Sequence, residues 1–136
     1  MNENLFETVF SVEFGDCDPA GIAFYPNYFK WLDATFHHWL REHGLNQELI
    51  GTRFGAVGTG LLEAGASFRA PMRPGDYLKI SISSIEWSKR TFKLTYLGTC
   101  DGNLTLEGHE VRGLLKNSQE GKLSLMPLEQ LRAIIE

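Results

Sequence analysis

Residues 14–28 read Phe-Gly-Asp-Cys-Asp-Pro-Ala-Gly-Ile-Ala-Phe-Tyr-Pro-Asn-Tyr, an acidic loop that leads into a helix. Asp16 and Asp18 bring two carboxylates into the loop, and Pro26 suits the first helical position because its missing N–H would have no partner there. The free N–H groups at a helix start can hold an oxyanion beside such a carboxylate. This stretch therefore predicts a loop-to-helix junction with a catalytic geometry.

The residues after the loop have the periodicity of one long amphipathic helix, from about Pro26 to His43, with Gly44 as its stop. Its apolar face is wide, which predicts that other elements wrap it. That face consists of Tyr28, Leu32, Phe36 and Trp39.

Most of the remaining chain predicts strands, because apolar and polar residues alternate between short turns. The expected strands are 6–14, a short Gly-rich strand or turn at 54–62, then 63–70, 77–87, 91–100 and 104–115. A phase change near Ser83 and Ser84 predicts a β-bulge. We expect a linker at 46–52 and a C-terminal helix at 128–135. Hairpin connections make the sheet antiparallel, so a long central helix wrapped by a curved antiparallel sheet gives an α+β fold.

Composition supports one domain over residues 1–136, since 43% hydrophobic residues are enough for one core. The net charge of −4 argues against nucleic-acid binding. We identify no export signal and no segment long enough to span a membrane. Cys17 and Cys100 lack metal-site spacing, so we expect no bound metal. With no export signal, we expect both to be reduced thiols in a cytoplasmic protein.

The loop motif Asp-x-Asp-x-x-Gly, followed by Tyr28 and the helix, resembles the signature of hotdog-fold acyl-CoA thioesterases, in particular the 4-hydroxybenzoyl-CoA thioesterase family. The resemblance implies a hotdog fold and hydrolysis of an acyl-CoA to a carboxylic acid and coenzyme A. It implies no cofactor, since coenzyme A is part of the substrate. It also implies a homodimer or homotetramer whose protomers pair edge to edge, with sites at their interface.

Asp18 is the predicted nucleophile or general base, because it matches the acidic residue of the family motif. A carboxylate can attack the thioester or activate water. Tyr25 would act through its main-chain N–H, which can polarise the carbonyl. The alternative is that Asp18 only forms a turn before Pro19. Asp16 is expected to hold the turn. Cys17, flanked by two carboxylates, is not expected to be a nucleophile.

Three further residues are candidates for contacts with the acyl thioester. Gly21 would permit a positive φ or a close approach of the substrate. Asn27 would reach the thioester or a water, or else be an exposed residue of the first turn. Asp33 matches a helix acid that the family associates with the substrate phenol, and a carboxylate can accept that hydrogen bond. It could equally be a solvated boundary residue.

The acyl group itself stays open at this stage. The 4-hydroxybenzoyl branch has an aromatic residue after the helix, but residues 44–52 contain no Trp or Tyr. An aromatic acyl group and a medium-chain acyl group are therefore both compatible with the sequence.

Lys89 and Arg90 are the predicted partners of the coenzyme A phosphates, because the family binds its nucleotide near the matching strand connection. A solvated turn is the alternative. Thr59 is a candidate lining residue of the acyl site. Glu63 is a weak alternative acid, because another thioesterase branch takes its carboxylate from a helix and Glu63 falls in a strand.

Two other functions remain as rivals. Hotdog hydratases and dehydratases typically place a histidine with an acid at the helix start, where this chain has Ile22, Ala23 and Phe24. A non-catalytic domain that binds acyl-CoA is the second rival, and the intact Asp18 argues against it.

Overall fold

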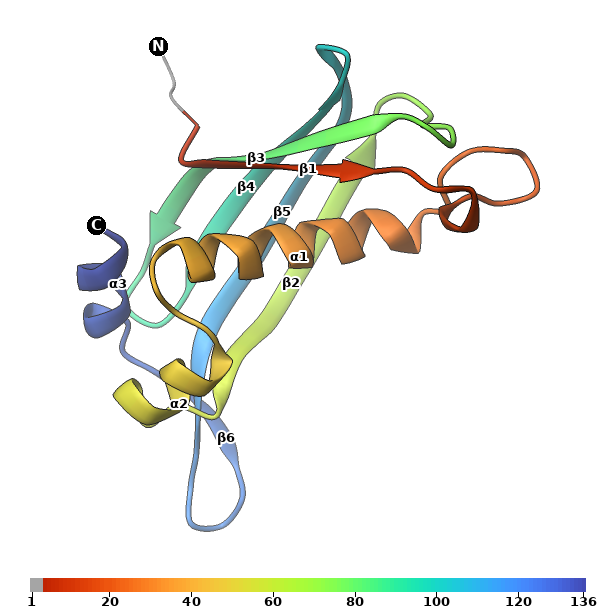
Figure 1. Cartoon of the computed structure of the whole chain (residues 1–136). Coiled ribbons are helices and arrows are strands. Elements are labelled where there is room, and N and C mark those ends of the chain that lie inside the picture. The colour runs from red at the N-terminus through yellow and green to blue at the C-terminus, as the bar shows by residue number, and fades with distance from the viewer. Residues whose placement is uncertain (1–3) are drawn as a thin grey trace.

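The computed structural model describes residues 4–136 and contains one antiparallel sheet that curves around a long helix, α1 (Figure 1). The elements, in chain order, are β1 (Phe6–Ser11), the 3₁₀ turn η1 (Phe14–Asp16), α1 (Pro26–Glu42), α2 (Gln47–Phe54), β2 (Gly58–Phe68), β3 (Tyr77–Trp87), β4 (Phe92–Cys100), β5 (Asn103–Asn117), β6 (Leu123–Met126) and α3 (Glu129–Ile135). The predicted α+β architecture is confirmed. No helix within residues 4–136 is both long and apolar enough to cross a membrane.

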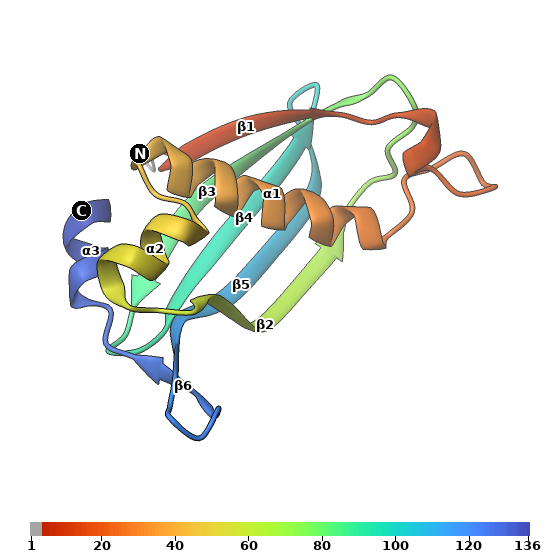
Figure 2. The same cartoon turned by 60° about the horizontal axis from the view of Figure 1, so that its bottom comes forward.

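The strands follow the order β1-β3-β4-β5-β2, and β6 adds to β5. All pairs are antiparallel. β1 and β2 are therefore the two ends of the main sheet, and α1 lies across its concave face (Figure 2). The predicted bulge in β3 is present, because the register with β4 shifts between Ile82 and Ser84.

The apolar face of α1 packs into the sheet as its periodicity predicted. Tyr28, Leu32, Phe36 and Trp39 are each at most 4% exposed. Gly108 allows this approach, because a Cβ built on it would lie 2.8 Å from Cδ1 of Leu32. Full burial of such side chains contributes about 1.5–3 kcal/mol each, so the sheet and α1 stabilise each other.

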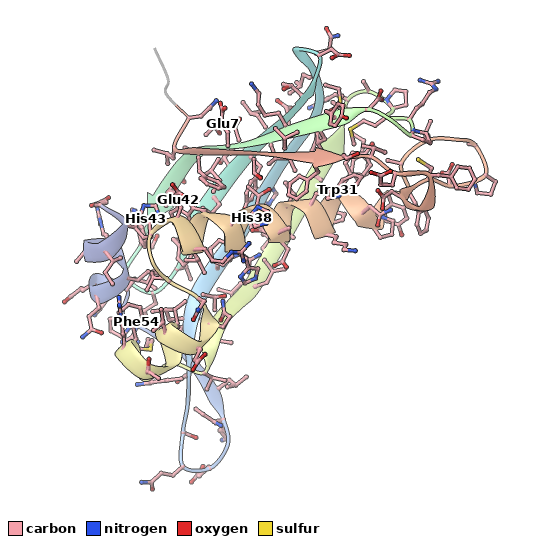
Figure 3. All side chains as sticks on the ribbon, viewed as in Figure 1. Glu7, Trp31, His38, Glu42, His43 and Phe54 are labelled. Atoms are coloured by element: carbon pink, nitrogen blue, oxygen red, sulfur yellow. The ribbon has the colours of Figure 1, made fainter. Side chains whose placement is uncertain are left out.

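The side of α1 next to β1 uses aromatic contacts (Figure 3). The ring of Phe10 in β1 stacks on His38 at 5.9 Å between centroids and lies 6.5 Å from the ring of Trp31. The Thr8 hydroxyl and His38 Nδ1 are 3.2 Å apart. These contacts fix β1 along the helix that begins at the acidic loop.

The predicted linker at 46–52 is wrong, because this segment forms α2. Asn46 caps the helix by accepting a hydrogen bond from the Leu49 N–H at 2.8 Å. Gly55 ends it in the left-handed conformation, at φ 70°. Asparagine at the N-cap and glycine just after the last turn are strong helix boundaries, and they outweigh the weak amphipathicity of the segment.

The strand predictions also differ from the structure at three places. The expected pieces 54–62 and 63–70 form one strand, β2, whose pairing with β5 merely shifts at a bulge between Leu61 and Glu63. β1 ends at Ser11 rather than at 14, because Val12 turns to pair with Asp76 and Gly75 beyond the ladder. β6 was not predicted; four residues without strong alternation give little signal until β5 pairs with them.

Candidate active site

The acidic loop is closed by hydrogen bonds between its own backbone groups. The Asp18 N–H donates to the Ile22 carbonyl at 2.9 Å, and the Gly21 N–H donates back to the Asp18 carbonyl at 2.9 Å. Gly21 has a φ of 79°, which confirms the predicted positive φ and explains why glycine stands there. The Ala23 N–H donates to the Met72 carbonyl at 2.8 Å, so the loop is also tied to the segment after β2.

Asp16 and Asn27 hold this loop against the start of α1. Asp16 Oδ2 accepts the Glu13 N–H at 2.8 Å, and the Asp16 carbonyl accepts both the Phe24 N–H and the Asn27 side-chain amide at 2.8 Å. The structural role predicted for Asp16 is confirmed. The Asn27 amide nitrogen serves the loop, and a contact between Asn27 and the thioester stays a prediction.

Asp18 has one carboxylate oxygen fixed and one free. Its Oδ1 accepts the Ala20 N–H at 2.9 Å, which orients the side chain. No donor within residues 4–136 reaches its Oδ2. The bond to Ala20 is the Asx turn expected of a turn former. The free oxygen leaves Asp18 able, in addition, to attack a carbonyl or to accept a proton from water.

The helix start supplies one unpaired N–H. Pro26 has none, the Asn27 N–H donates to the Phe24 carbonyl, and the Tyr28 N–H donates to the Tyr25 carbonyl. For the Tyr25 N–H, the described part of the chain offers no acceptor. This N–H, at the positive end of α1, is therefore available to an anionic oxygen.

Asp18 and Tyr25 line the same open pocket, with a volume of about 430 Å³. Its other lining residues are Ile22, Ala23, Phe24, Tyr28, Phe68, Arg69, Ala70 and Pro71. Asp18 is the one carboxylate of this lining, and Arg69 is engaged by Glu107 at 2.6 Å. The pocket thus combines a single carboxylate, a main-chain N–H without an acceptor in the described chain and aromatic walls, a set of groups that suits an acyl thioester.

Cys17 stands beside this site but is poorly suited to attack. Partial burial and the carboxylates of Asp16 and Asp18 raise the pKa of its thiol. The thiolate is the nucleophilic form of cysteine, so a raised pKa suppresses it. The prediction that Cys17 is not the nucleophile agrees with this environment.

Asp33 lies two turns further along α1, where it meets a buried ionic cluster. Its Oδ1 accepts a hydrogen bond from Arg112 Nη2 at 2.8 Å, and His37 Nε2 is 3.4 Å away. Arg112 also binds Glu110 twice, and the Tyr96 hydroxyl donates to Glu110 at 2.5 Å. Asp33 is therefore a half-exposed carboxylate held by the buried Arg112, and not a freely solvated boundary residue.

This cluster predicts a specific alkaline instability. Burial and the Glu110 carboxylate raise the pKa of Tyr96 well above its usual range. The unfolded chain loses that proton near about pH 10 while the folded chain keeps it, so stability is complete below this pH and falls as pH rises. We expect the free energy of unfolding in urea to drop more between about pH 9 and about pH 11 in wild type than in Tyr96→Phe. Equal slopes would contradict a protonated, buried Tyr96.

The other predicted residues lie at the opposite end of the sheet from Asp18. The β3–β4 turn with Lys89 and Arg90 is near α3 and β6, whereas the acidic loop is at the other end of α1 (Figure 1). The Lys89 carbonyl accepts the Leu128 N–H, and Arg90 donates to the Leu125 carbonyl at 2.9 Å. Thr59 shares hydrogen bonds with Gln47 at this same end. One chain thus does not bring these three residues to Asp18.

Comparison with known proteins identifies the family of this chain. A family model described as the thioesterase-like superfamily matches residues 12–134, which include the whole acidic loop. The chain belongs to this superfamily. It is 33% identical over 125 residues to 4-hydroxybenzoyl-CoA thioesterase of Pseudomonas sp. (strain CBS-3), and the match covers 90% of this chain and 85% of that protein.

Solved structures place this thioesterase-like protein in the hotdog fold. An aspartate-to-asparagine mutant of 4-hydroxybenzoyl-CoA thioesterase, complexed with 4-hydroxybenzoyl-CoA, matches with a TM-score of 0.88 at 28% identity over 96% of this chain and 98% of that chain. A gentisyl-coenzyme A thioesterase matches with a TM-score of 0.75 at 36% identity over 90% and 94% of the two chains. The predicted fold and family are confirmed.

Sequence reasoning missed two groups of residues in this thioesterase-like protein. Phe68 and Arg69 line the pocket from the end of β2, far from the acidic loop in sequence. Glu110 and Arg112 are buried at 2% and 3% exposure. The sequence does contain a sign of this pair. Glu110 and Arg112 are two residues apart, so they lie on the same face of a strand that is otherwise apolar, and buried charges are rare unless they pair.

Proposed function

We propose that this protein is an acyl-CoA thioesterase in which Asp18 is the nucleophile or general base and the Tyr25 N–H holds the carbonyl oxygen. The observation that carries the proposal is the shared pocket, where Asp18 has a free oxygen and Tyr25 has a free N–H. The structure of 4-hydroxybenzoyl-CoA thioesterase with 4-hydroxybenzoyl-CoA was obtained with an aspartate-to-asparagine mutant. This choice of mutant supports a catalytic role for an aspartate.

The reaction consumes one acyl-CoA and one water and yields a carboxylic acid and the coenzyme A thiol. Asp18 either attacks the carbonyl carbon, expelling the thiolate and leaving an anhydride that water cleaves, or removes a proton from an attacking water. In both routes negative charge develops on the carbonyl oxygen, where the Tyr25 N–H and the helix dipole stabilise it. No cofactor takes part in this proposal.

The acyl group is proposed to be aromatic. Phe24, Tyr28 and Phe68 contribute rings to the pocket walls, and aromatic side chains pack well against an aromatic ligand. Asp33 is the proposed acceptor for a hydroxyl on that ring. The relatives named for 4-hydroxybenzoyl-CoA and gentisyl-CoA support this choice.

The proposed working unit is a homodimer joined through β2, on which a homotetramer can be built. β2 is an edge strand of 11 residues, and Leu61, Leu62 and Phe68 on it are about half exposed, at 52%, 50% and 47%. An uncovered apolar edge of this length favours pairing with another strand. β1, the other edge, has only 6 residues.

Antiparallel pairing of two β2 strands would also complete the coenzyme A site. A two-fold axis through the middle of β2 puts the Gly58 end of one strand beside the Phe68 end of the other. Lys89, Arg90 and Thr59 of the partner subunit would then lie at the end that holds Asp18. The cationic side chains of Lys89 and Arg90 suit the phosphates of coenzyme A.

The proposed location is the cytoplasm, which the unpaired thiols of Cys17 and Cys100 support.

The test is release of free thiol from a panel of benzoyl-, 4-hydroxybenzoyl-, phenylacetyl- and straight-chain acyl-CoA thioesters. We expect turnover, with aryl substrates preferred. Preference for straight chains would remove the aromatic assignment and keep the enzyme. Absence of thiol release across the panel, with acyl-CoA binding retained, would replace the proposal by a non-catalytic binding domain.

A further inference from the structure

The ionic cluster beneath α1 is not needed by the reaction described so far. It consists of Glu110 and Arg112 on β5 and Tyr96 on β4, which are at most 3% exposed. Every buried polar side-chain atom of the described chain, including those of this cluster, has a hydrogen-bond partner. A buried ion pair contributes little stability compared with apolar residues of the same volume. The cluster therefore calls for an explanation other than stability.

Arg112 connects this cluster to the open side of α1. Its Nε and Nη2 bind the two oxygens of Glu110, both at 2.9 Å, and Nη2 also donates to Asp33 Oδ1 at 2.8 Å. Its guanidinium lies 3.9 Å from the centre of the Phe36 ring. Burial would lower the pKa of Arg112, but its bonds with Glu110 and Asp33 outweigh burial and raise it, so the side chain stays charged.

Asp33 is thereby fixed with one oxygen unoccupied. Within residues 4–136, no donor reaches Asp33 Oδ2. On β2, the residue opposite Glu110 is Ala64, which is small and exposed and leaves this side of the helix uncovered. The free oxygen can accept a hydrogen bond but cannot donate one while the carboxylate is ionised.

Asp33 is also placed in line with the pocket. It lies eight residues after Tyr25, about 12 Å along the helix axis, and its side chain leans back toward the helix start. Between them, Phe29 packs against Phe68 of the pocket wall, with ring centroids 6.4 Å apart. An aryl acyl group with its carbonyl at the Tyr25 N–H would extend along this apolar strip toward Asp33.

We infer that Arg112 is a positioning residue for acyl selection: gripped by Glu110, it fixes the Asp33 carboxylate so that its free oxygen accepts a hydrogen bond from a hydroxyl at the far end of the acyl group. The inference rests on the proposed thioesterase function. It concerns the choice of substrate and assigns Arg112 no contact with the reacting atoms.

The test compares kcat/KM for 4-hydroxybenzoyl-CoA and benzoyl-CoA, which differ only in the hydroxyl. Lysine cannot bind Glu110 and Asp33 with the geometry of a guanidinium fork. We expect Arg112→Lys to reduce the preference for the hydroxylated substrate by roughly tenfold, the usual effect of one hydrogen bond to a charged group, while benzoyl-CoA turnover changes much less. Tyr96→Phe is the matched control, because it disturbs Glu110 and leaves both Arg112 contacts; its preference should equal that of wild type.

A double-mutant cycle separates positioning from general loss of structure. Asp33→Ala should abolish the preference, and adding Arg112→Lys to it should reduce the preference no further, since both changes remove the same interaction. Additive losses, or an unchanged preference in Arg112→Lys, would overturn the inference. So would a wild-type protein that cleaves both substrates equally well.

Misfolding of Arg112→Lys would not end the test. The triple change Tyr96→Phe, Glu110→Met and Arg112→Met replaces the whole cluster by apolar side chains, an exchange that proteins often tolerate. This variant should melt near the wild-type temperature and lack the hydroxyl preference; a retained preference would overturn the inference. If wild type cleaved neither thioester nor any other of the panel, the proposed function itself would fail, which is a distinct result.

Discussion

Asp18→Asn is expected to lower kcat by roughly 10²- to 10⁴-fold, which is the usual contribution of a general base. The amide keeps the shape of the carboxylate and can still accept the Ala20 N–H, so the loop should stay folded. It can neither attack the thioester effectively nor take a proton from water. Initial rates of thiol release, with binding of the substrate measured separately, check this expectation.

Asp16→Asn is the matched control for this loss. It makes the same chemical change two residues earlier, where Asp16 Oδ2 only accepts the Glu13 N–H, a bond that an asparagine oxygen can also accept. We expect its turnover to stay close to wild type. A wild-type rate in Asp18→Asn, or an equal loss in Asp16→Asn, would remove Asp18 from the proposed mechanism.

The second large effect is expected from heterodimers. Changing Lys89 and Arg90 together to Ala should raise KM for acyl-CoA by roughly tenfold or more, because charge-assisted phosphate contacts are lost. A heterodimer of this double variant with Asp18→Asn contains one site with both defects and one intact site, if each site combines Asp18 of one protomer with Lys89 and Arg90 of the partner subunit. Such a heterodimer should show wild-type KM and about half the wild-type kcat.

Two affinity tags, one on each variant chain, allow this heterodimer to be purified after co-expression. The control is a heterodimer in which one chain carries all three changes and its partner is wild type. Under the shared-site arrangement each of its two sites has one defect. The site with the Asp18→Asn change is nearly inactive and the other site lacks the phosphate contacts, so this heterodimer should show about half the wild-type kcat with a raised KM. If the first heterodimer instead kept the raised KM of the Lys89 and Arg90 variant, both ends of the site would belong to one chain.

The parts of the fold that follow local periodicity could be predicted from the sequence. The face of α1 from Tyr28 to Trp39 and the alternation of β3, β4 and most of β5 each depend on neighbours in the chain. α2 was missed because its boundaries depend on Asn46 and Gly55 more than on an apolar stripe. β6 was missed because its four residues gain their strand geometry from β5.

In the site, the acidic loop, the helix start and the roles open to Asp18 and Tyr25 could be predicted from the chain, because a turn, its positive-φ Gly21 and the first helical turn are all local structures. The residues that face them come from distant parts of the chain and required the folded arrangement. It brought Phe68 to the pocket, set Arg112 under Asp33, and placed Lys89 and Arg90 at the far end of the sheet. The reason is that strand order and register join residues far apart in sequence, and local periodicity carries no record of that pairing.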